Sequence, residues 1–327
     1  MSERPVSQAA ALPRVCVLLA TCNGLPWLGA QLDSILNQNG VEVEVLASDD
    51  GSSDGTREWL QQRAVADPRV RLLPPATRFG SAAANFYHLM QAAGTGRYAM
   101  FAFADQDDVW YGDKLQRHVM LLEQNGADGV SSDVRAFWPS GRTRLIRKSR
   151  PQRLHDHLFE PPGPGCSFLM RASLVEWCAG LLRDMEVAGL PPLPRHDWFV
   201  YLAARRSGRR WHIDDLPSLD YRQHARNEVG ANIGLLAALR RLVALWRGEY
   251  QVLVIQALVC ALFIDRQRGL EANGLHFSAL DILRHGRRRR IDAIVAMAFM
   301  PVGVDVALPR THQMPHGLGT HGDPIDE

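Results

Sequence analysis

The chain has 327 residues, of which 46% are hydrophobic and 22% charged, so it is large and apolar enough to bury a full core and is not an intrinsically disordered chain. Its formal net charge of only +2 argues against a dedicated nucleic-acid-binding protein, whose affinity would come from many phosphate contacts. The five cysteines are odd in number and lack any C-x-x-C spacing, which disfavours a disulfide framework and a zinc cage and suits a reducing cytosol.

Residues 1–13 contain no apolar core of the kind that a secretory signal needs, so we expect a disordered arm on a cytoplasmic protein. Beyond it, short β-branched apolar runs alternate with longer amphipathic stretches, the pattern of βαβ units on a largely parallel sheet. The expected strands are residues 15–20, 41–48, 70–73 and 98–103, and the expected helices are residues 26–38, 54–66 and 80–93. The pattern predicts an α/β fold, in which ligands bind at the carboxyl ends of the strands.

The pattern becomes mixed from about Gly126. Residues 129–137 are strand-like, a basic polar stretch follows to Arg153, and the Pro/Gly-rich residues 161–165 predict a turn or loop. Beyond Gly230, residues 235–246 and 252–264 are helical in character, and the segment 310–327, rich in His, Gly and Pro, predicts a disordered tail.

The segment 232–309 is predicted to be a helical, partly basic extension. Its apolar run at 252–264 is shorter than the ~20 residues that a membrane-spanning helix needs. Arginine lies beside its apolar stretches, at Arg240, Arg241, Arg247, Arg266, Arg268 and the run Arg287-Arg288-Arg289-Arg290. Such a pattern indicates peripheral contact with an anionic membrane. The alternative is a helical hairpin that packs on the catalytic domain or on a second subunit, which would make a homo-oligomer.

The most unusual polar segment is Asp105-Gln106-Asp107-Asp108, which directly follows an apolar run. Three carboxylates at a strand end repel one another unless a cation lies among them. Mg²⁺ or Mn²⁺ held by one or two carboxylates commonly completes its shell with phosphate oxygens, so the segment indicates a metal site for a diphosphate group. The alternative is a helix N-cap formed by Asp108 or Asp113, although a cap needs one acid and not three.

A second acidic segment, Asp49-Asp50-Gly51-Ser52-Ser53-Asp54-Gly55-Thr56, also follows an expected strand. A D-G turn followed by a Ser or Asp N-cap would explain much of it. The functional alternative is that a doubled acid at a strand end accepts hydrogen bonds from a nucleobase or a ribose. Thr21-Cys22-Asn23-Gly24, at the end of the first strand, would line the same crevice.

Two further clusters occur later in the chain. In His196-Asp197-Trp198, a carboxylate is flanked by an imidazole and an indole, an arrangement suited to a general base, although such a triplet is also a common helix start. In Tyr221-Arg222-Gln223-His224, Arg222 suits bidentate contact with phosphate, and His224 suits a metal ligand or a donor to a leaving diphosphate. A surface loop is the alternative for this cluster.

Together and in this order, the four clusters resemble those of the family-2 glycosyltransferases with the GT-A fold, over residues 14–231. The forms Ala20-Thr21-Cys22-Asn23-Gly24 and Asp105-Gln106-Asp107-Asp108-Val109-Trp110 are most similar to the bacterial rhamnosyltransferase-like branch. The resemblance implies a Rossmann-like, mostly parallel sheet flanked by helices, followed by the helical C-terminal extension. Two departures are Cys22, where relatives usually carry an aromatic residue, and Ala225 after His224, where many carry Gly.

Carried over by position, the resemblance implies nucleoside contacts for Ala20, Thr21 and Asn23 and a base contact for Asp50. It implies that Asp105 lies beside ribose and metal, that Asp107 is a metal ligand with His224 as a further candidate, and that Asp197 is the catalytic base. Arg222 would bind the diphosphate of the donor. Contacts with the acceptor are implied for Gly165, Cys166, Ser167 and Trp198.

The resemblance therefore predicts an inverting glycosyltransferase that moves L-rhamnose from dTDP-L-rhamnose onto a hydroxyl of a lipid-linked or cell-surface polysaccharide. One rival has the same chemistry with UDP-glucose or UDP-galactose as donor. Another is a catalytically silent, membrane-associated scaffold, which would have no use for both Asp107 and Asp197. A two-metal nuclease or phosphatase would not need Asp50, and the low net charge offers no path for a polynucleotide.

Overall fold

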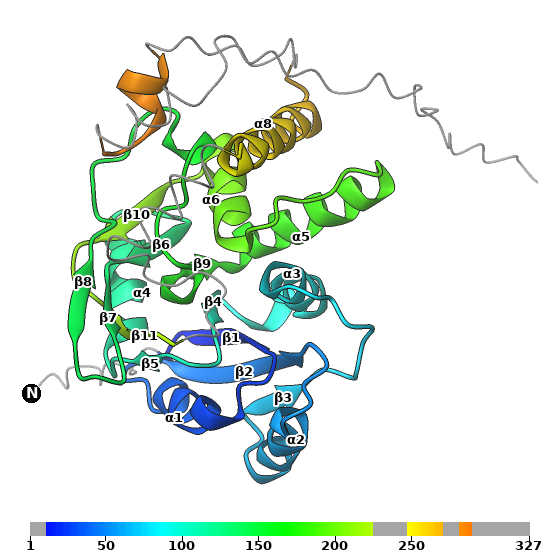
Figure 1. Ribbon diagram of the computed structural model, residues 1–327, viewed down its shortest axis with the longest axis vertical. Coiled ribbons are helices and arrows are strands. Elements are labelled where there is room, and N and C mark those ends of the chain that lie inside the picture. The colour runs from blue at the N-terminus through cyan, green and yellow to red at the C-terminus, as the bar shows by residue number, and fades with distance from the viewer. Residues whose placement is uncertain (1–10, 225–246, 271–280, 290–327) are drawn as a thin grey trace, which may run out of the picture.

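The computed structural model describes residues 11–224, 247–270 and 281–289 and is built on a central sheet with helices on both faces (Figure 1). Its seven strands lie in the order β10-β6-β9-β4-β1-β2-β3. They are β1 (Arg14–Thr21), β2 (Glu42–Asp49), β3 (Val70–Leu72), β4 (Met100–Ala104), β6 (Gly129–Ser132), β9 (Leu169–Arg171) and β10 (Trp211–Asp214). The first four pair in parallel, which confirms the predicted α/β class and the βαβ pattern of the first half.

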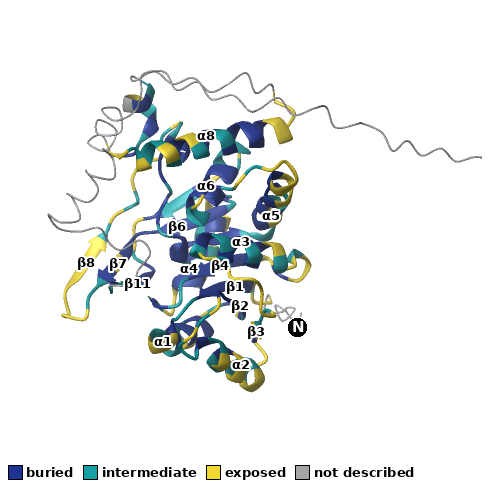
Figure 2. Cartoon of the chain, turned by 45° about the vertical axis from the view of Figure 1, so that its right-hand side comes forward, coloured by how far each residue is buried: buried dark blue, intermediate teal, exposed yellow. Residues whose placement is uncertain are grey.

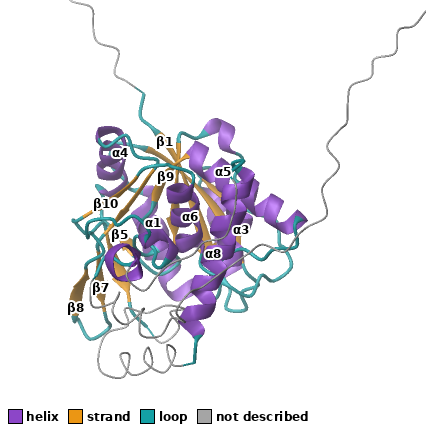
Figure 3. Ribbon diagram, turned by 90° about the horizontal axis from the view of Figure 1, so that it is seen from above, coloured by secondary structure: helices purple, strands orange, loops and turns teal. Residues whose placement is uncertain are grey.

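Alternation of side chains along β1 divides the core into two hydrophobic clusters, one on each face of the sheet. Val15, Val17 and Leu19 join the cluster covered by three helices, α1 (Leu25–Leu36), α2 (Thr56–Ala66) and α4 (Lys114–Gln124). Cys16 and Leu18 join the opposite cluster, covered by α3 (Ala82–Ala92), α5 (Ala172–Val187), α6 (His196–Arg206) and α8 (Glu249–Gln267). Figure 3 shows the helices around the strands from above.

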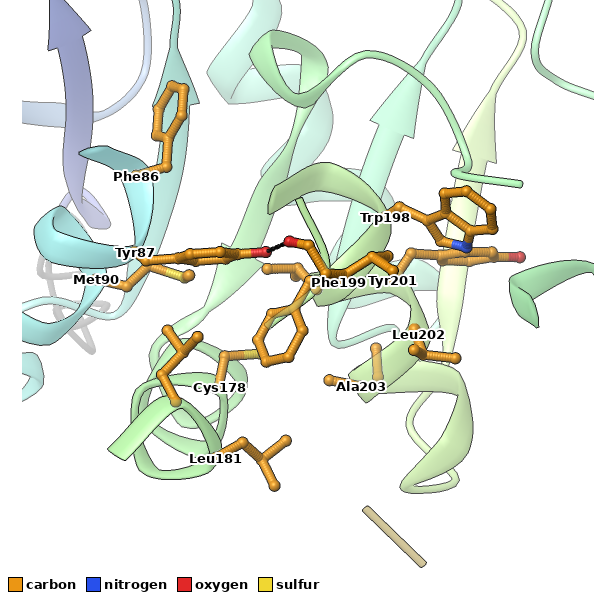
Figure 4. Close-up of a cluster of buried hydrophobic side chains, with 14 of the residues drawn as sticks. Phe86, Tyr87, Met90, Cys178, Leu181, Trp198, Phe199, Tyr201, Leu202 and Ala203 are labelled. Atoms are coloured by element: carbon orange, nitrogen blue, oxygen red, sulfur yellow. Dashed lines mark hydrogen bonds between the residues drawn. The ribbon is translucent and has the colours of Figure 1, made fainter. Parts of the chain in front are cut away.

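The second cluster is rich in aromatic side chains contributed by α3 and α6 (Figure 4). Tyr87 and Phe199 meet edge to face with ring centroids 5.4 Å apart, and the Tyr87 hydroxyl donates to the carbonyl of Leu193. Tyr201 packs edge to face on Trp211 in the same cluster. These contacts fix the position of α6, the helix that carries Asp197.

One strand of the sheet runs against the others. β9 lies between β4 and β6 and pairs antiparallel with both. In the ladder with β4, Leu169 of β9 lies opposite Ala102 of β4. At three residues it carries no clear periodicity, and the sequence did not predict it. The pairing brings the segment that precedes β9 to the same edge of the sheet as the end of β4.

The strand-like segment 129–137 is two strands that belong to different sheets. β7 (Val134–Phe137) joins a smaller sheet of order β5-β11-β7-β8, with β5 (Val109–Trp110), β8 (Thr143–Ile146) and β11 (Leu219–Arg222). Asp133 lies at the break, and its carboxylate accepts hydrogen bonds from the N–H groups of Lys148 and Ser149 at 2.6 and 2.9 Å. Figure 2 shows that β8 is the exposed edge of this sheet.

The helix α8 packs on the catalytic domain. This packing is one of the alternatives that the sequence left open for the C-terminal extension. Its apolar residues belong to the same cluster as α6, and Arg206 Nε donates to Asp265 Oδ1 at 2.8 Å. Among the residues that the structure describes, no helix is both long enough and apolar enough to cross a membrane. Several predicted segments lie outside the described residues. They are most of the arm at 1–13, the helix at 235–246, the tail at 310–327 and an apolar run of the sequence at 291–304, which follows the basic run.

Candidate active site

The polar segments singled out in the sequence meet at one edge of the central sheet. In the parallel ladders, Ala20 pairs with Ser48, Thr21 with Asp49, and Leu19 with Ala104. Because parallel strands end at the same edge, the segments after β1, β2 and β4 lie side by side. Their predicted clustering is confirmed.

The turn after β1 is held by the two segments beside it. The Cys22 N–H donates to Gln106 Oε1 at 2.8 Å, and Gln106 Nε2 donates back to the Cys22 carbonyl at 3.0 Å. A Cβ atom on Gly24 would lie 2.1 Å from the same Gln106 oxygen, so glycine is required there while Gln106 keeps this position. This role of Gln106 could not be predicted, because nothing in the sequence shows that a side chain between two acids reaches back to β1.

Asn23 joins this turn to the second acidic segment. It adopts a positive φ of 53°, which asparagine tolerates better than most residues. Its N–H donates to Ser52 Oγ at 2.7 Å, and its side-chain oxygen accepts from the Ser53 N–H at 2.8 Å. The first and second motifs thus form one continuous polar wall.

The second acidic segment divides its carboxylates between a turn, a cap and the crevice. Asp49 accepts from Thr21 Oγ1 at 3.0 Å and from the Ser52 N–H at 3.0 Å, and Asp54 accepts from the Thr56 N–H at 3.0 Å at the start of α2. The turn interpretation is therefore correct for Asp49. The predicted Ser or Asp N-cap is displaced, because Gly55 occupies the N-cap position of α2 and Asp54 bonds the first N–H of the helix from one residue earlier.

Asp50, the predicted base-binding residue, takes part in neither the turn nor the cap. Its carboxylate faces the segment before α3, where it accepts from the N–H groups of Phe79 and Gly80, the latter at 2.9 Å. The sequence did not single out this segment.

In the acidic cluster Asp105-Gln106-Asp107-Asp108, Asp107 contacts residues at the end of β11. His224 Nε2 lies 2.6 Å from Asp107 Oδ2, and Arg222 Nε donates to the Asp107 carbonyl at 2.7 Å. The His224 ring stacks on Trp27, with centroids 4.0 Å apart, a contact that the sequence did not reveal. Burial raises the pKa of the Asp107 carboxyl, and His224 opposes that rise. The structure thus joins the acidic cluster and the Tyr221–His224 cluster, which lie more than a hundred residues apart.

Asp108 is fully buried behind Asp107 and accepts from the Arg222 N–H at 3.1 Å. Burial raises its pKa well above the ordinary range, and Asp107 and Asp105 add to the rise. Of the two N-cap candidates, Asp113 occupies the N-cap of α4 but makes no side-chain capping hydrogen bond, and Asp108 is not at the helix start.

The acidic cluster fits a divalent cation by its donors. Asp105, Asp108 and Cys166 each offer a ligand atom within 4.8 Å of the other two, whereas the predicted set of Asp105, Asp107 and His224 does not gather this closely within the described chain. Asp108 Oδ2 is buried and makes no hydrogen bond within the described residues, and a buried carboxylate oxygen of this kind is what a cation satisfies.

A buried lysine, not predicted from the sequence, lies beneath the cluster. Lys114 is fully buried, its Nζ donates to the Cys166 carbonyl at 2.5 Å, and it lies 3.1 Å from the centroid of the Trp110 ring. Burial lowers its pKa to about 7, although Asp108 opposes this. Its place at the start of an amphipathic helix made it look like a surface residue.

The His196-Asp197-Trp198 triplet begins α6. Asp197 lies in the first turn and is partly exposed, and its carboxylate accepts from the Trp198 N–H at 2.8 Å. The His196 ring stacks on Phe86 with centroids 4.0 Å apart, and burial lowers its pKa to about 4. His196 is therefore neutral at pH 7.

The predicted acceptor residues lie against this helix start, but three of their side chains face the core. Trp198 is only 2% exposed, with its indole N–H donating to the His157 carbonyl at 2.8 Å, and Cys166 and Ser167 are fully buried. The side chains of these three residues are therefore turned away from solvent, and the position of their loop near the acceptor stays a prediction. Gly165 packs so closely on His196 that a Cβ atom there would lie 2.4 Å from Nε2, which places this loop directly beside the start of α6.

Comparison with known proteins agrees with this geometry. The sequence model described as glycosyl transferase family 2 matches residues 16–179. The chain is 34% identical, over 88% of its length and 100% of the relative's, to the Shigella flexneri protein named dTDP-rhamnosyl transferase RfbG. It is 31% identical, over 46% of its length and 57% of the relative's, to the Escherichia coli protein named UDP-Glc:alpha-D-GlcNAc-diphosphoundecaprenol beta-1,3-glucosyltransferase WfgD.

Among solved structures, the fold is similar to that of S. aureus TarS 1-349 in complex with UDP-GlcNAc. The TM-score is 0.53 at 14% identity, and the match covers 87% of this chain and 90% of that one. At this identity the likeness shows the fold alone, which is that of the GT-A glycosyltransferases. With the family match and the near full-length relative, it establishes that the chain belongs to glycosyl transferase family 2 and is a glycosyltransferase.

Proposed function

We propose that this glycosyltransferase moves L-rhamnose from dTDP-L-rhamnose, with inversion, onto a hydroxyl of a lipid-linked or cell-surface polysaccharide. The observation that carries the proposal is the similarity, over nearly the whole chain, to a protein named a dTDP-rhamnosyl transferase. The crevice at the ends of β1, β2 and β4 supports it, because it gathers polar groups suited to a nucleoside and to a diphosphate in one place.

On the donor side, Asp50 would bind the base. Each of its oxygens accepts one backbone N–H, from Phe79 and Gly80, and a carboxylate oxygen has a second lone pair for a base N–H. Ala20, Thr21 and Asn23 would line the nucleoside beside it. Arg222, anchored at the Asp107 carbonyl, would stabilise negative charge on the departing diphosphate.

A divalent cation, Mg²⁺ or Mn²⁺, at the acidic cluster would neutralise the diphosphate leaving group. Asp105 and Asp108 offer ligand atoms that already lie close together, and Asp107 and His224, which pair with each other at 2.6 Å, would turn toward the ion to join them. The carboxylates would otherwise repel that group.

On the acceptor side, Asp197 would take the proton of the attacking hydroxyl. It stands in the first turn of α6, beside the loop that contains Gly165. The neutral, stacked His196 would orient this turn rather than carry a proton.

We also propose that the enzyme works in the cytoplasm at the inner face of the membrane, where a lipid-linked acceptor is presented. Arg266, Arg268 and Arg289 are exposed and could contact anionic lipid.

A donor panel tests the proposal. The full chain would be incubated with dTDP-L-rhamnose, UDP-glucose or UDP-N-acetylglucosamine, a lipid-linked glycan acceptor and Mg²⁺ or Mn²⁺, and the anomeric configuration of the product would be read by NMR. We expect transfer from dTDP-L-rhamnose with inversion. Efficient transfer from a UDP-sugar alone would replace the donor assignment, and neither binding nor turnover of any donor would favour the scaffold.

A further inference from the structure

A second group of buried charges lies away from the crevice, around η2 (Asp156–Leu158). Asp156 is fully buried and Glu160 nearly so. Carboxylates are rarely buried to this degree unless cations or hydrogen-bond donors surround them. The partners of these two acids connect parts of the chain that are far apart in sequence.

The helix α6 supplies the first partners. Tyr201 Oη donates to the Asp156 carboxylate at 3.0 Å, and Arg205 Nη1 lies 3.1 Å from Asp156 Oδ1. Arg205 Nη1 also donates to Tyr201 Oη at 2.7 Å. One carboxylate thus ties η2 to the middle of the helix whose first turn carries Asp197.

The described segment 281–289 supplies the second partners, through Arg288. The Arg288 N–H donates to Glu160 Oε1 at 2.6 Å, and its Nε lies 3.4 Å from the same oxygen. Its Nη1 lies 3.8 Å from Asp156 Oδ2, and its Nη2 donates to the Pro161 carbonyl. Arg287 adds a contact of 3.6 Å to Glu160. Arg288 therefore touches both acids and the first residue of the Pro/Gly-rich loop.

This finding corrects one expectation about the basic run. Arg288 is 6% exposed, so the membrane contact predicted for residues 287–290 does not include it. An arginine that contacts a lipid surface keeps its guanidinium in the headgroup layer, whereas that of Arg288 points into the protein.

Backbone contacts hold the same segment in place. The π-helix η4 (Ile282–Gly286), orange in Figure 1, lies along residues 153–159. The His155 N–H donates to the His285 carbonyl at 3.0 Å, and Arg153 donates to the Arg284 carbonyl. A Cβ atom on Gly286 would lie 3.2 Å from the Phe159 ring, so the two segments of the chain pack in direct contact.

The stretch held in this way leads directly to the acceptor side of the site. It continues from Glu160 through residues 161–164 to η3 (Gly165–Ser167). It touches the start of α6 at two points, where Trp198 Nε1 donates to the His157 carbonyl and where Gly165 packs on His196. A shift of residues 156–165 would therefore displace the first turn of α6.

We propose that residues 282–288 form a C-terminal clamp, in which Arg288 is a positioning residue that fixes residues 156–165 and, through them, the acceptor side of the active site. This inference rests on the proposed function, because it takes Asp197 as the base and the Gly165 loop as a neighbour of the acceptor. The contacts of Arg287, Arg288 and residues 284–286 fall on residues 153–161, which are not part of the donor crevice, whereas the same stretch meets the acidic cluster further on, at Cys166. Loss of the clamp should therefore affect acceptor use more than donor binding.

The test compares Arg288→Ala with a matched control, Arg284→Ala, in the full chain. Arg284 lies on the same segment but its side chain is exposed, and only its backbone carbonyl takes part in the contacts. Three quantities would be measured: the Kd for dTDP with metal, the slow hydrolysis of dTDP-L-rhamnose without acceptor, and kcat/KM for the acceptor. We expect Arg288→Ala to lower kcat/KM for the acceptor roughly 10- to 100-fold, the scale of a displacement of about 1 Å at a reacting group. The dTDP Kd and the hydrolysis rate should change less than about twofold, and Arg284→Ala should change none of the three.

Glu160→Gln is a second variant that tests the clamp if Arg288→Ala does not fold. It keeps the side-chain shape and an acceptor oxygen but removes the negative charge that Arg288 contacts. It should give the same selective loss in smaller measure, and the double variant should lose no more than Arg288→Ala alone, since the two act as one unit. Unchanged acceptor kinetics in Arg288→Ala, or equal losses in donor binding and transfer, would overturn the clamp.

Hydrogen exchange separates the clamp from the proposed function. Faster amide exchange over residues 156–167 in Arg288→Ala, with α1 and β2 unaffected, supports the clamp even if no donor is turned over by the wild type. Absence of wild-type turnover would instead count against the proposed function, and unchanged exchange would count against the clamp.

Discussion

Asp197 and His196 are neighbours in the sequence, but the structure gives them different surroundings. His196 is stacked on Phe86 inside an aromatic cluster, whereas Asp197 is partly exposed at the start of α6. A partly exposed carboxylate can exchange protons with an acceptor, and a neutral imidazole whose Nε2 is buried cannot do so as readily. Of the two residues, Asp197 is therefore the one we propose as the base.

Replacing Asp197 by Asn keeps the side-chain shape but removes the group that accepts the proton. Positioned bases typically contribute 10²–10⁴-fold, so kcat for transfer should fall by about that factor while dTDP binding stays nearly unchanged. Asp215→Asn, at an exposed aspartate, serves as the control. Near-normal turnover by Asp197→Asn would remove this residue from the mechanism.

The pKa of His196 makes protein stability depend on pH. Its folded value of about 4 lies below its ordinary value of 6.5, so its full contribution is present above pH 6.5 and is lost as the pH falls toward 4. Because His196 takes up a proton on unfolding at pH 5, the free energy of unfolding should be about 2 kcal/mol lower at pH 5 than at pH 7. The loss between pH 7 and pH 5, measured by urea unfolding, should be smaller by about that amount in His196→Gln. Equal losses in both proteins would mean that His196 is not held neutral.

Asp107 differs from Asp197 in that its loss should damage binding and turnover together. Asp107→Ala should abolish the dependence of dTDP binding on Mg²⁺ or Mn²⁺, because it removes the carboxylate beside His224. The measurement is a thermal-shift titration of dTDP with and without metal, since ligand at 100 times its Kd stabilises by about 2.7 kcal/mol. Asp113→Asn on the exposed side of α4 is the control. Metal-dependent binding of wild-type strength in Asp107→Ala would show that the carboxylate is structural.

At the scale of elements, the turn after β1 depends on one amide side chain. Gln106 makes two hydrogen bonds to the Cys22 backbone and fills the space beside Gly24. This contact connects the end of β1 to the acidic cluster after β4. The shape of the nucleoside crevice therefore depends on the length and amide of Gln106 as well as on the acids around it.

Gly24→Ala should expel Gln106 from this position, because a Cβ atom would lie 2.1 Å from its side-chain oxygen. We expect dTDP to bind about tenfold more weakly, the effect of losing roughly 1.4 kcal/mol of binding free energy. The loss of protein stability should be small, because the clashing atoms lie at the far end of the flexible Gln106 side chain. Isothermal titration with dTDP would measure this. Gly29→Ala, where the added Cβ would come no closer than 3.9 Å to Trp59, is the matched control. Unaltered dTDP affinity in Gly24→Ala would show that the turn does not shape the crevice.

Elements that repeat a strong pattern were predictable, and elements defined by distant partners were not. The strands before Thr21, Asp49 and Asp105 and the helices between them follow from hydrophobic period and turn residues. β9 has three residues and takes its place only through antiparallel pairing with β4 and β6. The break at Asp133 depends on N–H groups fifteen and sixteen residues later.

At the scale of the whole molecule, the same contrast holds for the site. The sequence gives the chemistry of the strand ends, because acids that follow apolar strands are unusual and their carboxyl ends must meet. It does not give Lys114, Gln106 or Arg288, each of which is an ordinary polar residue until the fold brings it against a partner 52 to 128 positions away. Neighbours in space, rather than residue type, decide their roles.

The antiparallel pairing of β4 with β9 has a consequence for how the two substrates meet. The acidic cluster begins where β4 ends, and the Gly165 loop stops where β9 begins, so a ladder with Ala102 opposite Leu169 joins them. Backbone hydrogen bonds of a buried central sheet do not stretch appreciably, unlike a hinge between domains. On the proposed assignments, the spacing between leaving group and incoming hydroxyl would be set mainly by strand register while the clamp holds the loop, and a change in sugar size would be accommodated by side chains along the gap.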